Sequence, residues 1–395
     1  MSSPVIVSAV RTPVGKAPKG MLSSTRPDDM AAVAMRAAIE RVPGLKSGDV
    51  EDIYIGCAMP EAEQGMNVAR LAAFRAGIPY TVPAMTLNRF CSSGLQSISF
   101  AADRINSGAA HCIVAGGTES MSMIPMGGHK VAPNPALIES YPETYLSMGL
   151  TAENLAHDFK IGREEQDAFA LESHRRALAA MEAGRFRDEM VPIEVRKRKA
   201  GSGGARAAGT PDTLLVDRDE SVRAETTVEA LGALRPAFQK DGTVTAGNAP
   251  PVNDGAAAVV VMSAQRAARL NLTPMARIVG QATSGLPPKY VLMTPVEAVR
   301  RLSRKIAWPL DEVDLYELNE AFSVQAVAVV RELGLDPQKV NVNGGAVALG
   351  HPIGASGARI LTTLLYALRE RKLKRGIATL CLGGGNGVAL AVERI

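Results

Sequence analysis

One cysteine, Cys91, lies where its thiol is suited to act as a nucleophile, in the stretch NRFCSSGL at 88–95. Apolar residues recur behind it at helical spacing as far as Ile105, which predicts a helix that begins at the cysteine. Free backbone N–H groups and the positive end of the helix dipole meet at such a start, lower the pKa of a thiol and favour the thiolate. Taken alone, the stretch fits a nucleophile and a small buried hydrophobe equally well.

Three further segments carry side chains suited to the same chemistry. His351 is flanked by a glycine and a proline, which excludes the helix face where a packing histidine normally lies, and we interpret it as functional. Asn319 follows an apolar segment, where it is suited either to a site or to capping the next helix. Cys381 alternates with two leucines, and this pattern by itself favours a place in the core.

The composition is that of a globular protein of two or three domains, since 46% of the 395 residues are hydrophobic. The net charge of +4 is a small difference between 44 basic and 40 acidic residues, and aromatic residues make up 4%, so nucleic-acid binding is not expected. The four cysteines have neither disulfide-scaffold nor zinc spacing, and we expect no metal. We find no membrane span and no targeting segment, and therefore expect a cytoplasmic protein.

The first 120 residues alternate strand-like and helix-like segments, which predicts an α/β unit. Asp28 or Asp29 is expected to cap the first helix. Strands are predicted at 5–10 and 109–115, the last ending in Gly116-Gly117, and residues 49–56 are predicted to be a short helical turn leading into a strand. Helices are predicted at 28–41, 65–74 and behind Cys91.

The rhythm changes after residue 120. Residues 121–135 are rich in Pro, Gly, Met and His and are predicted to be irregular, and helices are predicted at 151–159 and 163–183. His174 falls on the apolar face of the second helix, so we interpret it as a packing residue. The basic stretch at 196–209 fits a solvated hairpin tip, with contact to an anionic ligand as the alternative.

The first rhythm then returns, which indicates an internal duplication. DVEDIY at 49–54 has its counterpart in DEVDLY at 311–316, and CSSG at 91–94 has its counterpart in GASG at 354–357. In each copy a periodic helix and an apolar strand follow. The halves of such a protein meet at the carboxyl ends of strands, where sites form. We therefore expect Cys91, Asn319, His351 and Cys381 to lie together.

Four motifs occur in the order and spacing of the active-site motifs of thiolases: NRFCSSGL at 88–95, NEAF at 319–322, GHPIG at 350–354 and CLGGGNG at 381–387. The chain resembles this family over essentially its whole length. The resemblance implies an α/β protein with the thiolase fold, two duplicated halves in a five-layered α-β-α-β-α core. It assigns residues 1–119 and 249–272 to the N-terminal half, 120–248 to a loop domain covering the active site, and 273–395 to the C-terminal half.

The resemblance also implies roles for five residues. Cys91 is the nucleophile that becomes acylated, and His351 is the base that activates it. Cys381 is the acid and base for the α-carbon. His351 and a water held by Asn319 form an oxyanion hole for the thioester enolate, and the N–H groups of Cys91 and Gly383 form a second one for the tetrahedral intermediate.

CoA enters as a co-substrate, and the resemblance implies no permanently bound cofactor. Arg223 aligns with an arginine near the adenosine end of CoA. Ser147-Met148 and Ala249-Pro250 align with positions along the pantetheine arm. Acetoacetyl-CoA-forming relatives carry a histidine in place of Ser147, and many relatives carry a serine in place of Pro250.

The segment at 133–148 resembles degradative thiolases, so we expect an acetyl-CoA C-acyltransferase that cleaves 3-ketoacyl-CoA in fatty-acid β-oxidation. The alternative is a biosynthetic acetoacetyl-CoA thiolase that condenses two acetyl-CoA molecules. A lipid carrier without chemistry would not need both cysteines and His351, and a cysteine hydrolase would leave Cys381 without a role. The expected partners are acyl-CoA, CoA and further copies of the chain, as a homodimer or homotetramer.

Overall fold

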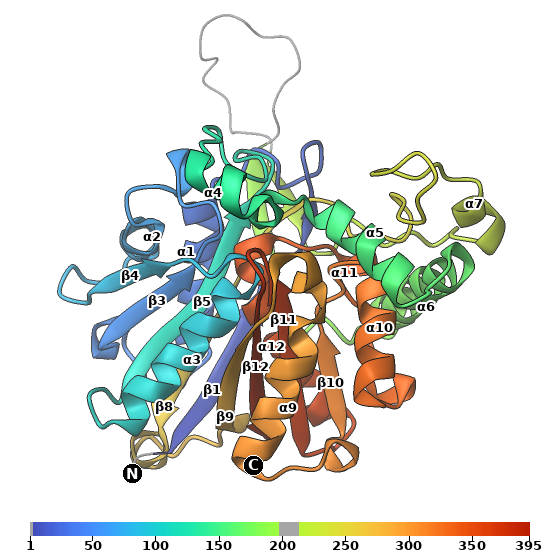
Figure 1. Ribbon diagram of the computed structural model, residues 1–395. Coiled ribbons are helices and arrows are strands. Elements are labelled where there is room, and N and C mark those ends of the chain that lie inside the picture. Colours follow the sequence, from blue (N-terminus) through green and yellow to red (C-terminus); the bar gives the residue numbers. More distant parts are fainter. Residues whose placement is uncertain (1–2, 197–212) are drawn as a thin grey trace, which may run out of the picture.

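The computed structural model describes residues 3–196 and 213–395 (Figure 1). In this part of the chain ten strands form one mixed sheet, in the order β10-β11-β12-β9-β1-β8-β5-β3-β4, with β2 paired to β8. The bounds of these strands are β1 Pro4–Arg11, β2 Gly15–Lys16, β3 Asp52–Gly56, β4 Ala84–Leu87, β5 Cys112–Ser120, β8 Asn253–Ser263, β9 Ala276–Gly285, β10 Leu315–Leu318, β11 Arg375–Leu382 and β12 Asn386–Glu393.

The sheet consists of two half-sheets with the same topology, which confirms the duplication seen in the sequence. In the first, β3 pairs parallel with β5, and β5, β8 and β1 follow antiparallel. In the second, β10 pairs parallel with β11, and β11, β12 and β9 follow antiparallel. The halves join where β1 and β9 pair over two residue pairs, Val5 with Arg277 and Ile6 with Ala276.

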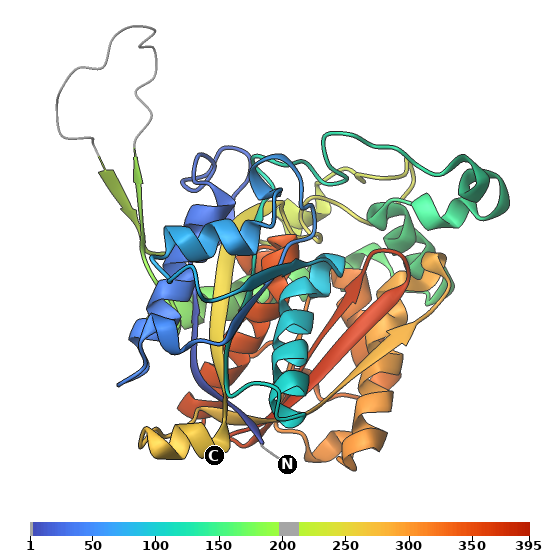
Figure 2. The ribbon, with the colours of Figure 1, turned by 90° about the vertical axis from the view of Figure 1, so that its left-hand side faces the viewer.

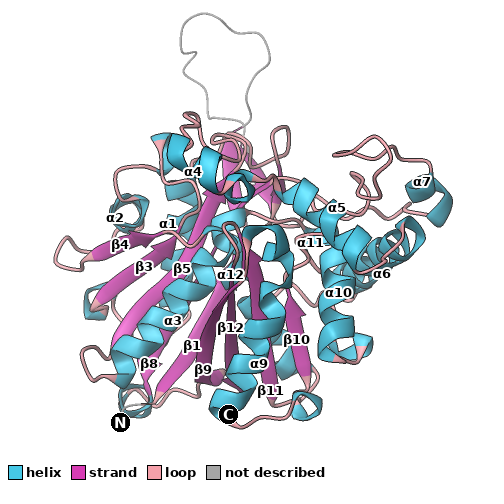
Figure 3. Ribbon diagram, in the orientation of Figure 1, coloured by secondary structure: helices cyan, strands magenta, loops and turns pink. Residues whose placement is uncertain are grey.

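Helices cover both half-sheets and also separate them. Outer helices α1 and α2 pack on the first half-sheet and α9 on the second, while α3 and α12 contact each other and strands of both halves. In Figure 3, α3 and α9 lie in front of the first and second half. The bounds of the core helices are α1 Pro27–Glu40, α2 Val68–Arg75, α3 Ser93–Asn106, α8 Ala264–Arg269, α9 Thr294–Ile306, α10 Ser323–Leu333, α11 Ala346–Leu349 and α12 Ile353–Glu370.

Three apolar clusters fill the spaces between these layers. The central cluster joins α3 and α12 with both half-sheets, through residues such as Ile98, Leu361 and Leu380. One outer cluster joins α1 and α2 with the first half-sheet, and the other joins α9 and α10 with the second. Since alternate residues of a strand face opposite sides, the same strands supply both a central and an outer cluster. This arrangement is the five-layered α-β-α-β-α core expected from the resemblance.

Helices α3 and α12 approach closely because each carries a glycine at the crossing. A Cβ on Gly94 would lie 2.8 Å from the backbone nitrogen of Ala358, and one on Gly357 would overlap the backbone of Leu95. The two glycines occupy equivalent positions in the two copies of the duplicated unit. The small residues at the helix starts therefore bring together the two halves of the protein.

Three sequence-based boundaries were wrong. Helix α1 begins at Pro27 after Arg26, so Asp28 and Asp29 lie in its first turn and neither caps it. Helix α2 begins at Val68 and not at residue 65, because Met66 and Asn67 have positive φ angles of +52° and +57°. Strand β5 continues past its glycines to Ser120. Gly117 lies where the start of α12 approaches the strand, and a Cβ there would overlap the carbonyl of Gly354. Glycine there permits a close approach and does not end the strand.

The segment between β5 and β8 lies largely outside the layers. It carries the helices α4 Pro135–Ser140, α5 Met148–Asp158, α6 Arg163–Glu182 and α7 Val228–Gly232 and the hairpin of β6 Ile193–Arg196 with β7 Thr213–Val216. Figures 1 and 2 show the two chain termini together at the end of the molecule opposite α4. The basic stretch predicted to be a hairpin tip lies, from residue 197 on, outside the described residues. The domain boundaries at 120, 249 and 273 stay predictions.

Within the described ranges, none of the helices combines the length and the apolar character that crossing a bilayer requires.

Candidate active site

Cys91 lies in a 3-10 turn, Phe90–Ser92, that leads directly into α3, so the predicted helix start is confirmed. Phe90 has a φ of +43°, in the left-handed region that non-glycine residues avoid. The side chain of Asn88 holds this turn, because its Oδ1 accepts from the Phe90 N–H (2.8 Å) and its Nδ2 donates to the Ala58 carbonyl (3.0 Å). A strained backbone beside a thiol is typical of a functional position.

The electrostatics of Cys91 differ from the sequence-based expectation. Burial of the thiol raises the pKa of Cys91 to about 12, and the negative charge of Glu119 acts in the same direction. The N–H groups of Cys91 and Gly383 reach the sulfur and lower its pKa, but they do not outweigh desolvation. The N–H groups thus act on the thiol as the helix start predicts, but desolvation is the larger effect, and the balance favours the neutral thiol in the free protein.

His351 lies between α11 and α12, off any helix face, as its flanking residues predicted. Its backbone N–H donates to Asn253 Oδ1 (2.8 Å), and its Nδ1 lies 2.6 Å from Ser356 Oγ. The Ser356 hydroxyl donates its single proton to the Pro352 carbonyl (2.8 Å), which can only accept. Nδ1 therefore carries the imidazole proton and Nε2 is the free base in this network.

The imidazole of His351 is neutral over the physiological range. Burial and, to a smaller extent, the nearby guanidinium of Arg359 lower the pKa of His351 to about 3. Cys91 packs against the small apolar cluster that contains Ile353, and its turn contacts α12, which begins two residues beyond His351, so the base and the thiol belong to neighbouring segments. A neutral imidazole beside a neutral thiol can accept its proton.

Asn319 follows β10 directly, at the end of the strand that the sequence indicated. Its backbone N–H donates to the Thr379 carbonyl of β11 (3.0 Å), and its side chain is completely buried. Neither Oδ1 nor Nδ2 of this amide has a hydrogen-bond partner among the described residues. A buried amide with both polar atoms free fits the expected task of holding a water molecule.

Cys381 is buried near the end of β11, as its alternation with leucines predicted. Burial raises its pKa, and so does its proximity to Cys91. The segments around the two cysteines also meet, since a Cβ on Gly383 would lie 3.4 Å from the Phe90 ring. The structure thus brings Cys91 next to Cys381 and Gly383, which belong to a distant part of the sequence.

The residues aligned with CoA contacts fall into two groups. Met148 and Ala249 pack against the outer cluster that contains Phe322 and Cys381. Pro250 is half-buried, two residues before Val252, which forms a parallel bridge with His351.

The other two residues of this set lie at the surface. Ser147 is exposed and caps α5, accepting from the Leu150 N–H. Arg223 is also exposed, with Nη2 3.4 Å from the Ala246 carbonyl, and its backbone N–H donates to Nδ1 of the buried His174. His174 is therefore packed in the fold, as its helix face predicted.

Sequence reasoning missed four buried polar residues that support the site. Ser356 and Asn253 hold His351, and Glu320 accepts from the Ser173 hydroxyl, the Asn341 amide and the Val347 N–H. Glu119 lies at the end of β5 near Cys91. For the two glutamates a signal existed, since an acid within or next to an apolar strand is uncommon unless it has partners.

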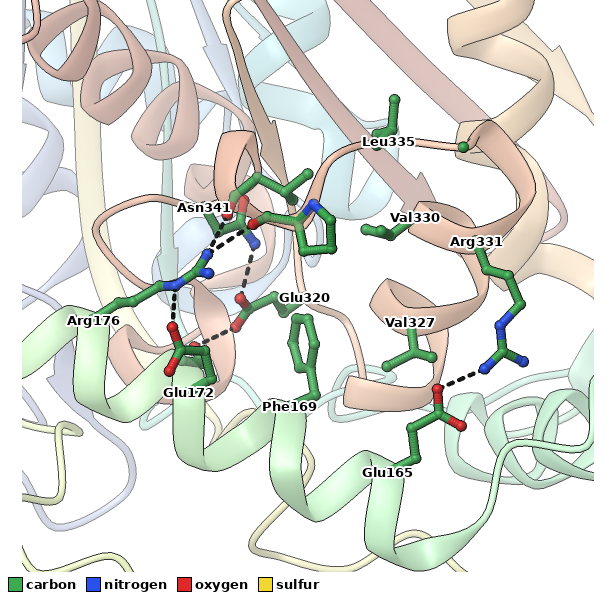
Figure 4. A pocket seen from close by; sticks show the side chains of 14 residues that line it. Glu165, Phe169, Glu172, Arg176, Glu320, Val327, Val330, Arg331, Leu335 and Asn341 are labelled. Atoms are coloured by element: carbon green, nitrogen blue, oxygen red, sulfur yellow. Dashed lines mark hydrogen bonds and ion pairs between the residues drawn. The ribbon is translucent and has the colours of Figure 1, made fainter. Parts of the chain in front are cut away.

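A cavity of about 580 Å³ lies between α6 and α10, and neither Cys91, His351 nor Cys381 lines it (Figure 4). Apolar side chains such as Phe169 and Val327 line it, with the ion pair of Glu165 and Arg331 at one side. Glu320 lies at its inner end, hydrogen-bonded to Asn341. None of the residues lining it is a predicted catalytic or CoA-binding residue.

Comparison with known proteins gives a consistent family. The family model of the thiolase N-terminal domain matches residues 4–265, and that of the thiolase C-terminal domain matches residues 272–394. The 3-ketoacyl-CoA thiolase of Bacillus subtilis is 48% identical over 393 residues, covering all of both chains. The acetyl-CoA acetyltransferase of Pseudomonas aeruginosa is 48% identical over 406 residues, again covering all of both chains.

A solved structure agrees with these relatives. The crystal structure of the Bacillus anthracis acetyl-CoA acetyltransferase matches with a TM-score of 0.90 and 42% identity, over 100% of this chain and 99% of that one. The chain has the thiolase fold, belongs to the thiolase family and is an acyltransferase that acts on CoA thioesters.

Proposed function

We propose that this protein cleaves 3-ketoacyl-CoA with free CoA, giving acetyl-CoA and a shortened acyl-CoA, in the β-oxidation of fatty acids in the cytoplasm. The observation that supports the proposal is the meeting of the Cys91 turn with the segment of Cys381 and Gly383, where a Cβ on Gly383 would lie 3.4 Å from the Phe90 ring and the N–H groups of Cys91 and Gly383 lower the pKa of the Cys91 thiol. Two donors at a nucleophile match the oxyanion of acyl transfer. A second thiol is needed only if the reaction also adds a proton to a carbon atom or removes one from it, as at the α-carbon of acetyl-CoA.

In the first half-reaction, Nε2 of His351 takes the Cys91 proton as the sulfur attacks the 3-keto carbon. Because the free protein favours neutral thiol and imidazole, the proton moves as the carbon–sulfur bond forms. The N–H groups of Cys91 and Gly383 hold the resulting oxyanion. The bond between C2 and C3 then breaks, and its electron pair forms the acetyl-CoA enolate. The Cys381 thiol protonates that enolate at C2.

In the second half-reaction, CoA replaces acetyl-CoA. The Cys381 thiolate takes the proton of the CoA thiol, whose sulfur attacks the acyl group on Cys91. Cys91 leaves as a thiolate and regains its proton from His351. Every residue then has its starting protonation state, which is consistent with a reaction that needs no permanently bound cofactor. Protonated Nε2 of His351 and a water at Asn319 hold the thioester oxygen when the enolate exists.

The length of the acyl chain separates the degradative function from its alternative, an acetoacetyl-CoA thiolase that condenses two acetyl-CoA molecules. Relatives with either name are equally similar to this chain. We expect longer 3-ketoacyl-CoAs to be cleaved at least as efficiently as acetoacetyl-CoA, since Ser147 and Pro250 replace residues of the acetoacetyl-CoA-forming group along the pantetheine arm. Steady-state kcat/KM across chain lengths measures this preference. A strict preference for acetoacetyl-CoA favours the alternative, and cleavage without free CoA contradicts both.

We also propose a homodimer, or a tetramer built from such dimers, that pairs through β4. This strand is bonded to β3 on one side and ends the sheet order on the other, among described residues. Exposed apolar side chains lie on and near it, with Met85 43% and Phe74 50% exposed. An exposed edge of this kind pairs readily with a second copy around a two-fold axis.

Met85→Arg is expected to shift the dimer towards monomer, because a charge on β4 opposes the pairing of two such edges. Leu215→Arg, on β7, is the matched control, since Leu215 is similarly exposed at 54% but lies in another sheet. Sedimentation velocity measures both variants. An unchanged association state for Met85→Arg contradicts an interface at β4.

A further inference from the structure

Glu119 is a buried acid with no place in the reaction described above, yet it joins two segments of the site. Its side chain is 1% exposed at the end of β5. Oε2 accepts from the N–H groups of Ala58 and Gly354, both at 2.8 Å. Oε1 accepts from Gln64 Nε2 at 2.6 Å and from the Met59 N–H at 3.3 Å.

One of these contacts leads to the nucleophile. Ala58 donates its N–H to Glu119, and its carbonyl accepts from Asn88 Nδ2 at 3.0 Å. Asn88 in turn accepts the N–H of Phe90, the residue with positive φ next to Cys91. The position of the strained turn that carries Cys91 thus depends, through two residues, on the Glu119 carboxylate.

The other contact leads to the base. Gly354 is in the first turn of α12, three residues beyond His351 and two before Ser356, which binds the imidazole Nδ1. A Cβ on Gly354 would lie 2.6 Å from Glu119 Oε2, so the helix start and the carboxylate are in close contact. A single side chain therefore fixes the first turn of α12 relative to the loop at 57–64.

The ionised form of Glu119 is the one that this environment fits. Every backbone or amide group within hydrogen-bond distance of its oxygens is a donor, and the Cys57 thiol, 3.9 Å from Oε1, is only a weak acceptor, so a proton on the carboxyl would lack a good acceptor. Burial raises the pKa of Glu119, and these donors act in the opposite direction. A glutamine would turn its NH₂ group towards one of the donor pairs. Gln64 cannot rotate its amide to compensate, because its Oε1 accepts from the Ser120 N–H at 2.5 Å.

We propose that Glu119 is a positioning residue for the thiolase reaction, holding the Cys91 turn and the His351 segment in the relative placement that proton transfer requires. The proposal rests on the roles given above to Cys91 and His351. It assigns to Glu119 no contact with substrate.

A second property makes this role measurable. The negative charge of Glu119 raises the pKa of Cys91, so its removal lowers that pKa. The elements around the Cys91 turn also present Cys381 from β11 and His351 from the start of α12. Those groups are neutral in the free protein, and Arg359 acts on His351, whereas Glu119 is the charged side chain that shifts the pKa of Cys91. Loss of the positioning contacts is therefore expected to lower turnover, while loss of the negative charge is expected to make the Cys91 thiol reactive at lower pH.

The test compares Glu119→Gln with Gly354→Ala, which keeps the charge but forces the bridge apart. For Glu119→Gln we expect kcat for thiolysis to fall about 10²-fold with KM within about threefold of wild type, because placement and not affinity is lost. Its rate of iodoacetamide reaction at Cys91, followed by peptide mapping across pH, is expected to move to lower pH. Gly354→Ala is expected to lose kcat with an unmoved alkylation profile.

Asp52→Asn is the matched control. Asp52 is 8% exposed at the far end of β3 and accepts from Tyr54 and Arg104, so its loss removes a buried carboxylate without touching the site. A folded Glu119→Gln that retains kcat within about twofold overturns the proposal, as does an equal loss in Asp52→Asn or an unmoved alkylation profile in Glu119→Gln.

If Glu119→Gln does not fold, Gln64→Leu supplies the test by removing one donor and leaving the backbone contacts. A partial loss of kcat supports the proposal and an unchanged kcat overturns it. Wild type and Cys91→Ala are assayed in parallel. An inactive wild type or an active Cys91→Ala means that the proposed function has failed, whatever the Glu119 variant does.

Discussion

Cys381→Ala is expected to lose cleavage and condensation of the carbon–carbon bond by about 10²-fold or more while still exchanging acetyl groups between CoA and Cys91. Cys381 moves a proton on or off the α-carbon, and acetyl exchange forms no carbanion. The variant removes a buried thiol next to Cys91 and leaves the backbone unchanged. The nucleophile Cys91 therefore keeps the N–H groups that lower its pKa. Exchange of labelled CoA and thiolysis, measured in one preparation, give the comparison.

Cys91→Ala is the matched control, and it is expected to lose both activities because no residue remains to carry the acyl group. An equal loss of exchange and thiolysis in a folded Cys381→Ala contradicts the division of work between the two cysteines. Circular dichroism and thermal melting verify that each variant is folded.

His351→Ala is expected to lower kcat/KM for thiolysis by about 10²- to 10⁴-fold, because both the base for Cys91 and a donor to the thioester oxygen are removed. The pH profile of the wild type gives a second measurement. With the pKa of His351 lowered to about 3, the base form persists from neutral pH down to about pH 3. Thiolysis should therefore show no loss of activity on the acid side with a midpoint near the ordinary pKa of histidine.

Ser356→Ala is the matched control for His351. It keeps the imidazole and removes the acceptor of Nδ1–H, so the ring is less well oriented and a loss of about tenfold is expected. An acid limb with a midpoint near pH 6.5 in the wild type would show that the imidazole is not held in its neutral form. A His351→Ala variant with kcat/KM near that of wild type would contradict its role as base.

The sequence determined the parts of this protein that depend on local patterns. Alternating apolar segments predicted the α/β class, and the repeated DVEDIY and CSSG patterns predicted two half-sheets of equal topology. The four motifs predicted the thiolase family, and the catalytic roles that they imply stay predictions. Helical periodicity placed Cys91 at a helix start and His174 on a packed face. These features depend on spacings of a few residues, which a sequence displays directly.

Contacts between distant segments were decided only in the tertiary structure. The glycines of CSSG and GASG read as helix-start residues, but in the fold Gly94 and Gly357 are where α3 and α12 cross. Gly117 looked like the end of a strand and instead admits the carbonyl of Gly354. Each glycine has a partner hundreds of residues away, so no local pattern shows what it approaches.

The tertiary structure also decided how far the side chains of the site are removed from water. A helix start predicted a thiolate at Cys91, yet the layers packed around it raise its pKa to about 12. The same packing lowers the pKa of His351 and surrounds Glu119 with donors from two other segments. The pKa of a group depends on every atom that displaces water from it and on charges from all sides. Those atoms come from strands and helices that are adjacent only after the two halves have packed together. The sequence alone therefore predicts candidate reactive groups but not their protonation states.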